Sequence, residues 1–417
     1  MADFLIDNAR LICPGDRVFH GWLLISDGVI AEIGDDDAPD SLNGNRLDAE
    51  GRRLTPGLID MHTHGMHRFN YDRGAGELRE AAALLGRYGT TTVIPTLVPN
   101  LGGRMWALLP ELSDALPGMD CVSIPGLHLE GPFVAITGAA CETRDGDLGL
   151  LKELIAACGG RVSVMSVAPE VPGILPVIEH LRAEGIVPFI THTRASAEQT
   201  LAAIDAGARH ATHFYDVFPV PEETDPGVRP VGAVEAILGH PDATCDFICD
   251  GIHVHPVAVR AALAAKGCAR VSLITDASFG AGLGPGVYDT PWGYPVEVKP
   301  GNAPRIADPA HPYYGALAGS ALTMNQGMRN LLAWVEKPEA EVWAMGTSSP
   351  AHVLGLTDRG RLEPGMRADL VLWNDDEALT PAAVWVGGKD TLNRPPLAEG
   401  GCRDFSDSSD NRSLKSL

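Results

Sequence analysis

The chain has 417 residues, of which 45% are hydrophobic and 21% are charged, as is ordinary for a globular protein in water. Its formal net charge of −22 argues against nucleic acid or an anionic membrane surface as a partner, because long-range repulsion would oppose both. The N-terminal stretch lacks the pattern of a signal peptide, and no window reaches the ~18 apolar residues that span a bilayer. The 8 scattered cysteines form no Cys-x-x-Cys pair, which favours reduced thiols in a cytoplasm.

The two ends of the chain share a pattern of short strands and turns. Aliphatic and β-branched runs, punctuated by Gly, Asn and Asp, fill residues 1–55 and return over 358–399. We therefore predict one small β-domain made of both ends, with residues 56–357 inserted between them. Residues 400–417 are polar and rich in Ser and Asp, which predicts a disordered tail.

Residues 56–357 alternate apolar strands with amphipathic helices. Ala- and Leu-rich stretches such as "ELREAAALLGRYG" and "PVAVRAALAAKG" follow most of the strands. This alternation predicts a parallel sheet of the α/β class, and eight such units predict a closed (β/α)₈ barrel. The candidate strands are "GLIDMHTHG", "TTVIPTLV", "CVSIPGLHLEGP", "RVSVMSVAPE", "IVPFITHT", "ARHATHFYD", "ATCDFICDGIHV" and "RVSLITDAS".

Residues of metal-ligand and acid–base types follow several of these strands. In a (β/α)₈ barrel, the catalytic groups lie at the carboxyl ends of the strands. His62 and His64 lie two residues apart, so strand alternation directs both to the same side. The full set, in chain order, is His62 and His64 on the first strand, Glu130 on the third, His192 on the fifth, His213 on the sixth and Asp276 on the eighth.

Each of these residues has a plainer explanation when it is taken alone. A single His at a strand end is usually a hydrogen-bonded polar residue, and a single Asp there often caps the next helix. Six such residues at the predicted catalytic ends of one barrel indicate a shared metal site instead. Their imidazole and carboxylate groups suit zinc most readily, while iron, manganese and cobalt stay open, as does the choice between one and two ions.

Such a site predicts hydrolysis at an sp² carbon. A bound divalent metal lowers the pKa of its water from about 16 to about 7 and polarises a carbonyl oxygen. A carboxylate in contact with that water can take its proton and pass it to a departing nitrogen. Asp276 is our candidate for this role, and an amide, a cyclic imide or an amidine-like ring carbon is the candidate substrate group.

Several motifs resemble those of the amidohydrolase superfamily, and more closely those of N-acetylglucosamine-6-phosphate deacetylases. The resemblance covers about the whole chain apart from the tail. It implies that the β-domain is a composite sandwich, that the reaction cleaves the N-acyl amide of an amino sugar or related amine, and that the protein forms a homodimer. The motifs are "PGLIDMHTHG", "GTTTVIPTLV", "GLHLEGPF", "DAGARHATHFYD", "CDGIHV", "LITDA", "LAGSALTMNQGMRNL" and "GRLEPGMRADLVLW".

The resemblance also implies roles for individual residues. Glu130, His192 and His213 would bind the principal metal, with His62 and His64 allowing a second one. Asp276 would be a ligand and the general base and acid. By the same resemblance, the substrate would contact His253, and the segment from Leu317 to Met324 would line the sugar pocket.

Three departures from the family pattern concern the substrate. Ala140 stands where the family has a substrate-binding His, and the acidic Asp216 stands where it has a phosphate-binding Asn. The window in which a phosphate-binding Arg is expected is acidic, and only Arg229 could replace it. A carboxylate about 4 Å from a phosphate repels it by roughly 1 to 4 kcal/mol. We therefore expect intact metal chemistry on an N-acylated small molecule that is not the usual 6-phosphosugar.

Two other functions stay open at this stage. One is a cyclic amide hydrolase or deaminase of the same superfamily, although those enzymes often use a carboxylated Lys, and the position of Glu130 argues against that type. The other is a scaffold that kept the fold and lost catalysis. A complete ligand set argues against the scaffold.

Overall fold

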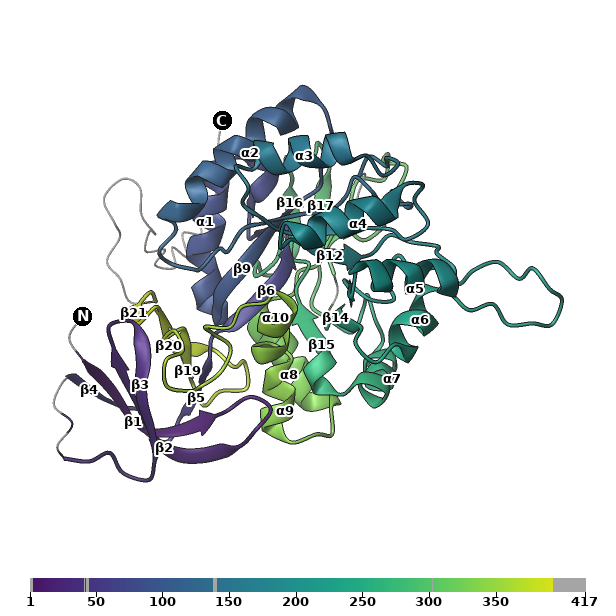
Figure 1. The fold of residues 1–417 in the computed structure, drawn as a ribbon. Coiled ribbons are helices and arrows are strands. Elements are labelled where there is room, and N and C mark those ends of the chain that lie inside the picture. Colours follow the sequence, from purple (N-terminus) through teal and green to yellow (C-terminus); the bar gives the residue numbers. More distant parts are fainter. Residues whose placement is uncertain (1–2, 41, 43–44, 138–140, 302, 393–417) are drawn as a thin grey trace, which may run out of the picture.

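The computed structural model describes residues 3–40, 42, 45–137, 141–301 and 303–392, and it places a barrel beside a smaller sheet domain (Figure 1). Neighbouring barrel strands are parallel, as predicted from their near-continuous apolar runs. The described chain contains an eight-stranded barrel sheet, in the order β6 (Leu58–Thr63), β9 (Thr90–Leu97), β10 (Leu127–Leu129), β11 (Val162–Val167), β12 (Val187–Ile190), β13 (His210–Ala211), β14 (Thr244–Ile248) and β15 (Val271–Ile274). Each predicted strand segment overlaps one of these strands, so the barrel prediction is confirmed.

Polar contacts join β15 to β6, the two ends of this strand order. The Asp60 carboxylate accepts hydrogen bonds from the backbone N–H of Thr275 at 3.2 Å and from its hydroxyl at 2.5 Å. The backbone N–H of Asp276 donates to the carbonyl of His62 at 2.8 Å, and that of His64 donates to the carbonyl of Ala277 at 2.7 Å. The seam of the barrel therefore closes at the level of the predicted metal ligands.

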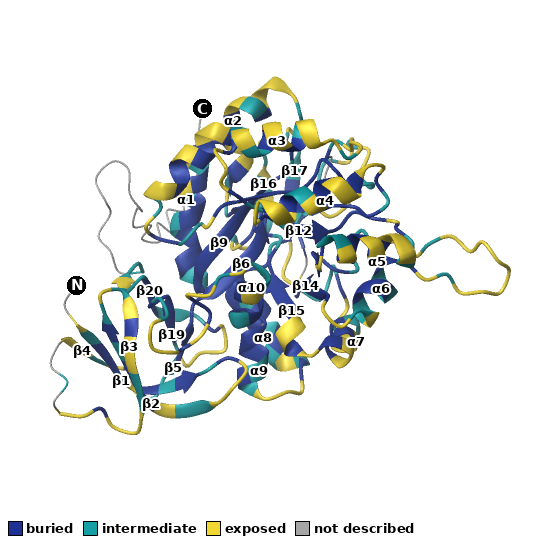
Figure 2. Ribbon diagram, viewed as in Figure 1, coloured by how far each residue is buried: buried dark blue, intermediate teal, exposed yellow. Residues whose placement is uncertain are grey.

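Amphipathic helices cover the outside of the barrel. On α1, for example, Leu78, Ala81, Ala82 and Leu85 are buried at the helical spacing, and Figure 2 shows buried inner faces and exposed outer faces on the surrounding helices. The helices are α1 (Ala75–Leu85), α2 (Gly103–Ala115), α3 (Leu148–Ala157), α4 (Ile174–Ala183), α5 (Ala197–Ala206), α6 (Ala233–Gly239), α7 (Pro256–Lys266), α8 (Met324–Trp334), α9 (Glu339–Ala344) and α10 (Ser348–Val353).

The two ends of the chain pair in one mostly antiparallel sheet, as predicted. Strand β5 makes the connection, because it pairs with β1 in parallel and with β19 antiparallel. Ile6, Leu23 and Leu370 are in the core of this domain. The sheet contains β1 (Phe4–Ile12), β2 (Val18–Ser26), β3 (Val29–Asp35), β4 (Asn45–Asp48), β5 (Arg53–Pro56), β19 (Leu370–Trp373), β20 (Pro381–Val386) and β21 (Lys389–Asp390).

Two small sheets extend the loops that follow the first and last barrel strands. They are formed by β7 (Gly65–Met66) with β8 (Phe69–Asn70), and by β16 (Gly286–Asp289), β17 (Pro295–Val298) and β18 (Arg305–Ile306). Within the described ranges, no helix has the length and apolar character needed to cross a membrane. The predicted tail at 400–417 lies outside the described residues, and it stays a prediction, as do the domain boundaries.

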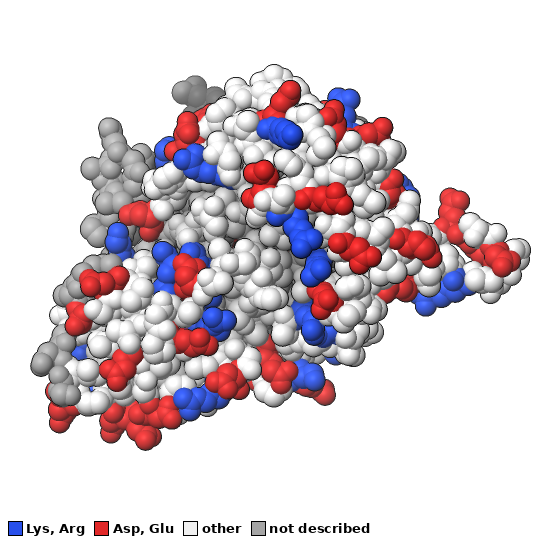
Figure 3. Space-filling view, in the orientation of Figure 1, with Lys and Arg blue, Asp and Glu red and all other residues white. Residues whose placement is uncertain are grey.

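Acidic and basic side chains are interspersed on the face drawn in Figure 3. Acidic side chains also gather along the lower edge of the sheet domain in that view. On this face, the acidic side chains are therefore spread over both the barrel and the sheet domain.

Candidate metal centre

The structure brings all six predicted ligand residues together at the carboxyl ends of the barrel strands. Four of them, all histidines, are clustered around a fifth, Glu130, which directly follows β10. Glu130 Oε1 lies 3.0 Å from Nε2 of His192 and 3.2 Å from Nε2 of His213. Its Oε2 lies 3.3 Å from Nε2 of His64 and 3.6 Å from Nε2 of His62. One carboxylate thus faces four imidazole rings.

Asp276 joins this cluster from the opposite side of the barrel seam. Its Oδ1 lies 3.2 Å from Nε2 of His64 and 3.6 Å from Nε2 of His62, and these two nitrogens are 3.3 Å apart. Among the described residues, two groups have ligand atoms within 4.8 Å of one another, and they share His62. The groups are His62 with Glu130 and His213, and His62 with His64 and Asp276.

The polar atoms of the cluster are suited to a cation. Glu130 Oε2 and His192 Nδ1 are buried and have no hydrogen-bond partner among the described residues. Buried polar atoms are rarely left unpaired, and a metal ion accounts for an unpaired carboxylate oxygen among imidazole nitrogens. The residues present therefore fit a divalent metal, as the sequence predicts.

Three of these residues have an unusual backbone conformation. The φ angles of His192, His213 and Asp276 are 47°, 36° and 47°, in the left-handed region that non-glycine residues seldom adopt. Each such conformation costs on the order of 1–3 kcal/mol and persists only where the surroundings impose it. The backbone strain at three strand ends is typical of a functional site.

Ionic hydrogen bonds shift the pKa values within the cluster. Burial opposes charge on His64, but the adjacent carboxylates of Asp276 and Glu130 raise its pKa to about 10. The pKa of His213 is likewise raised to about 10, because the bond to Glu130 outweighs burial. Burial also opposes charge on Asp276, yet the bond to His64 and the nearby imidazoles lower its pKa to about 2. Without metal, the cluster is therefore a network of imidazolium and carboxylate groups.

We predict that metal binding releases protons, because a metal ligates the neutral imidazole. With pKa values of about 10, His64 and His213 hold their protons at neutral pH in the metal-free protein. The apparent metal affinity should therefore rise with pH through the neutral range, about tenfold per pH unit for each proton released. Calorimetry in buffers of different ionisation enthalpy counts the protons, and a pH-independent affinity would contradict the prediction.

His253 and Asp216 lie beside this cluster. His253 follows β14, and its Nδ1 lies 2.6 Å from Oδ2 of Asp250. Burial opposes charge on His253, but that bond and the charges of Asp276 and Asp216 raise its pKa. The Asp216 carbonyl accepts a hydrogen bond from Nδ1 of His213 at 3.3 Å. Both predicted substrate-binding residues are thus adjacent to the candidate metal centre.

The remaining predicted substrate residues differ in their surroundings. Arg229 is 79% exposed and pairs with Glu235 at 2.7 Å, on the loop that projects beside α5 and α6 (Figure 1). Leu317 is 37% exposed, whereas Met324 is buried in the barrel core at the start of α8. The segment between them touches the metal centre through the backbone N–H of Ser320, which donates to the carbonyl of Asp276 at 3.1 Å. Ala140 lies outside the described residues.

Sequence reasoning missed the buried carboxylates that support the ligands. Asp60 accepts hydrogen bonds across the barrel seam, and Asp246 accepts one from the backbone N–H of His213. Both are acidic residues within mostly apolar strands, and this is the signal that would have identified them. His128 contacts the His62 ring edge to face at 4.7 Å between centroids, and one of its ring nitrogens lies 2.8 Å from Ser166 Oγ.

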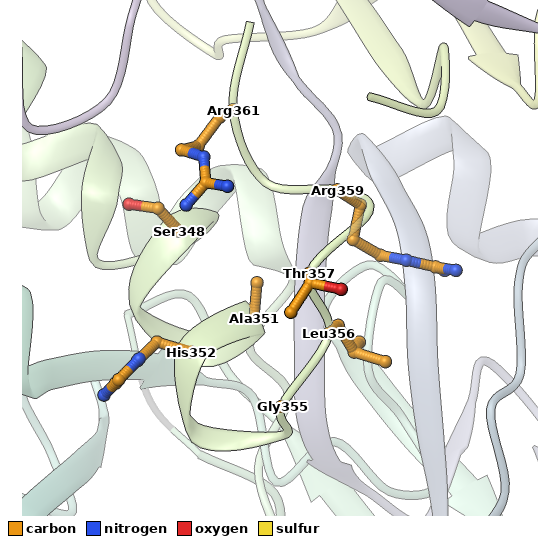
Figure 4. Close-up of a pocket in the computed structure, with 8 residues that line it drawn as sticks. All are labelled: Ser348, Ala351, His352, Gly355, Leu356, Thr357, Arg359 and Arg361. Carbon is orange, nitrogen blue, oxygen red and sulfur yellow. The ribbon is translucent and has the colours of Figure 1, made fainter. Parts of the chain in front are cut away.

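A small cavity lies elsewhere, around α10 and the loop that follows it (Figure 4). Ser348, His352 and Arg361 are among the residues that line it, and none of the six metal-centre residues does. Arg359 also lines it, but its guanidinium donates to Thr92 and Ser123 and so holds this loop to the barrel. We assign no function to this cavity.

A family model described as "Amidohydrolase family" matches residues 53–391 of the chain. The chain belongs to the amidohydrolase family. The match covers the barrel, all six metal-centre residues and the C-terminal strands of the sheet domain. This family is metal-dependent, in agreement with the fit of the cluster to a cation.

Curated relatives within this amidohydrolase family are sugar-phosphate deacetylases. The chain is 30% identical over 387 residues to N-acetylglucosamine-6-phosphate deacetylase of Bacillus subtilis, covering 89% of this chain and 93% of that protein. It is 31% identical over 384 residues to N-acetylgalactosamine-6-phosphate deacetylase of Escherichia coli, covering 89% and 96%.

Solved structures lead to the same conclusion. A crystal structure of N-acetyl-D-glucosamine-6-phosphate deacetylase from Mycobacterium smegmatis matches with a TM-score of 0.79 and 30% identity, covering 94% of this chain and 100% of that one. The predicted deacetylase-like activity on an amide carbon–nitrogen bond is therefore confirmed. The homodimer and the cytoplasmic location stay predictions.

Proposed function

We propose that this amidohydrolase deacylates an N-acylated amino sugar, or a related amine, that carries no 6-phosphate. The observation that carries the proposal is Asp216, whose charge acts on both His213 and His253 beside the metal centre. A carboxylate at that position would repel a phosphate and would favour a neutral or cationic group. The pairing of the exposed Arg229 with Glu235 supports the same conclusion, since this guanidinium already has a carboxylate partner.

The metal that we propose is zinc, as one ion or two. Glu130, His192 and His213 would hold the principal ion, and His62, His64 and Asp276 would provide the ligands for a second. Such an ion would supply an activated water and would polarise the amide carbonyl. These ligand types equally admit iron, manganese and cobalt, and metal analysis of the purified protein distinguishes them.

Asp276 would move the proton in this reaction. Its pKa of about 2 keeps it ionised at neutral pH, so that it can accept a proton from the attacking water. The proton then passes to the nitrogen of the amide as the carbon–nitrogen bond breaks. The products are a carboxylic acid and a free amine. His253, held by Asp250 at 2.6 Å, would orient the substrate.

The test compares two substrates on the metal-loaded protein. We expect a higher kcat/KM for N-acetylglucosamine than for N-acetylglucosamine 6-phosphate. Asp216→Asn should shift this ratio toward the phosphosugar by about tenfold or more, because roughly 1.4 kcal/mol of repulsion is removed. Initial rates of acetate release measure both values.

The control is Asp205→Asn, which neutralises an exposed carboxylate on α5. This variant should leave the substrate ratio unchanged. If the wild-type enzyme has the higher kcat/KM for N-acetylglucosamine 6-phosphate, the proposal that the substrate carries no 6-phosphate is wrong. If neither substrate reacts and the metal is present, other N-acylated amines become the candidates.

A further inference from the structure

A second buried polar cluster lies next to the candidate metal centre, on strands β13 and β14. At its middle is Asp246, which is completely buried within the strand sequence Thr244–Ile248. Its neighbours Cys245, Phe247 and Ile248 are buried apolar residues of the barrel core. A carboxylate in such a place is costly unless several hydrogen bonds compensate for its desolvation.

Those hydrogen bonds connect Asp246 to the segment that carries His213. Oδ1 of Asp246 accepts from the backbone N–H of His213 at 2.6 Å. Oδ2 lies 2.8 Å from Nε2 of His210, and the hydroxyl of Thr212 is 3.1 Å from both oxygens. The carboxylate therefore holds His210, Thr212 and the backbone of His213, where the φ angle of His213 is 36°.

Thr212 links Asp246 to the imidazole ring of His62, a second residue of the candidate metal centre. Its hydroxyl oxygen lies 3.2 Å from Nδ1 of His62. An ionised carboxylate only accepts hydrogen bonds, so the single hydroxyl proton of Thr212 is directed at Asp246. The hydroxyl oxygen must then accept from an N–H at Nδ1 of His62. This leaves a lone pair on Nε2 of His62, the nitrogen that faces Glu130 and Asp276 at 3.6 Å.

We propose that Asp246 is a positioning residue for the metal centre: through Thr212 it sets the tautomer of His62, and through the backbone N–H it holds His213. Partners of this kind, which orient metal-binding imidazoles from behind, commonly change metal affinity 10–100-fold when they are removed. The inference rests on the proposed role of His62 and His213 as ligands. It adds Asp246, which does not belong to either candidate ligand group among the described residues.

Asp246→Asn tests the proposal with little change in shape. An amide group cannot accept hydrogen bonds at its nitrogen, so the Thr212 hydroxyl is free to turn toward Nδ1 of His62. That change favours a proton on Nε2, where the ligand lone pair is needed. We expect the dissociation constant for zinc, measured by chelator competition, to rise about 10- to 100-fold. The visible absorption spectrum of the cobalt-substituted protein should change as well.

A matched control separates positioning from general stability. Asp369 is another buried carboxylate, and in the sheet domain it accepts from the backbone N–H of Gly387 at 2.7 Å and from Arg367 at 3.1 Å. Asp369→Asn should lower the melting temperature without changing the zinc dissociation constant or the cobalt spectrum. If Asp246→Asn behaves in the same way, the proposal is wrong and Asp246 only stabilises the barrel.

A second pair of variants decides the matter if Asp246→Asn does not fold. Thr212→Val removes the hydroxyl and keeps the bond between Asp246 and the backbone of His213, whereas Thr212→Ser keeps both. We expect weaker zinc binding for Thr212→Val and near-normal binding for Thr212→Ser. If the two variants bind zinc equally well, Thr212 does not set the tautomer of His62 and that part of the proposal is wrong. A wild-type protein that binds no metal would instead overturn the proposed function.

Discussion

Asp276→Asn should lower kcat for deacylation by about 10²- to 10⁴-fold, the usual contribution of a positioned general acid–base group. Asp276 is expected to be ionised at neutral pH, because its pKa is about 2, and Asn cannot accept the proton of the attacking water. The substitution keeps the shape of the side chain. Initial rates of acetate release, on protein whose metal content has been determined, measure the effect.

Asp289→Asn is the matched control for this variant. It neutralises an exposed carboxylate on β16, and we expect it to keep wild-type kcat. The metal content of Asp276→Asn matters, because Oδ1 of Asp276 also lies among the candidate ligand atoms. A variant that holds its metal and keeps more than about a tenth of the wild-type rate would show that another group moves the proton.

Glu130→Gln should abolish high-affinity metal binding and, with it, activity. The Glu130 carboxylate lies 3.0 Å from His192, 3.2 Å from His213 and 3.6 Å from His62, so its charge is shared by imidazoles on three strands. Removing one partner from a buried charge network costs about 3–5 kcal/mol. Elemental analysis after dialysis and equilibrium zinc titration measure the loss.

Glu179→Gln, at an exposed position on α4, is the corresponding control and should retain metal and activity. If Glu130→Gln still binds zinc fully, the ion is held by other residues.

The free energy of unfolding of the metal-free protein should also depend on pH. The pKa values of His64 and His213 are raised, so their stabilising contribution is complete below about pH 6.5 and is lost as the pH rises toward about 10.

Much of this architecture follows from local sequence patterns. Apolar runs bounded by Gly and Pro predicted the strands of the barrel, because a parallel sheet that is covered on both faces must be apolar throughout. The polar residues that interrupt the strand ends then predicted His62, His64, Glu130 and their partners as candidate metal ligands, and the structure places these side chains together. The two-residue spacing of His62 and His64 was informative because strand geometry places both on one side.

Other features depend on contacts between strands that are far apart in the sequence. The Asp246 carboxylate accepts a hydrogen bond from the backbone N–H of His213, which is 33 residues away in the sequence. The side chains of Thr212 and His62, which are in contact, are 150 residues apart. Strand periodicity specifies the side on which a residue lies, but not which residue of another strand lies opposite to it. That depends on the register between strands and on the closure of the barrel.

The sequence by itself thus determined the fold class, the pairing of the two chain ends and the chemical types of the residues at the candidate metal centre, because these depend on composition and period within single strands. Only the tertiary structure decided that Arg229 pairs with Glu235, that Met324 is in the core and that Asp246 accepts a hydrogen bond from the backbone N–H of His213. These outcomes depend on the register and packing of separate elements, which local patterns do not encode.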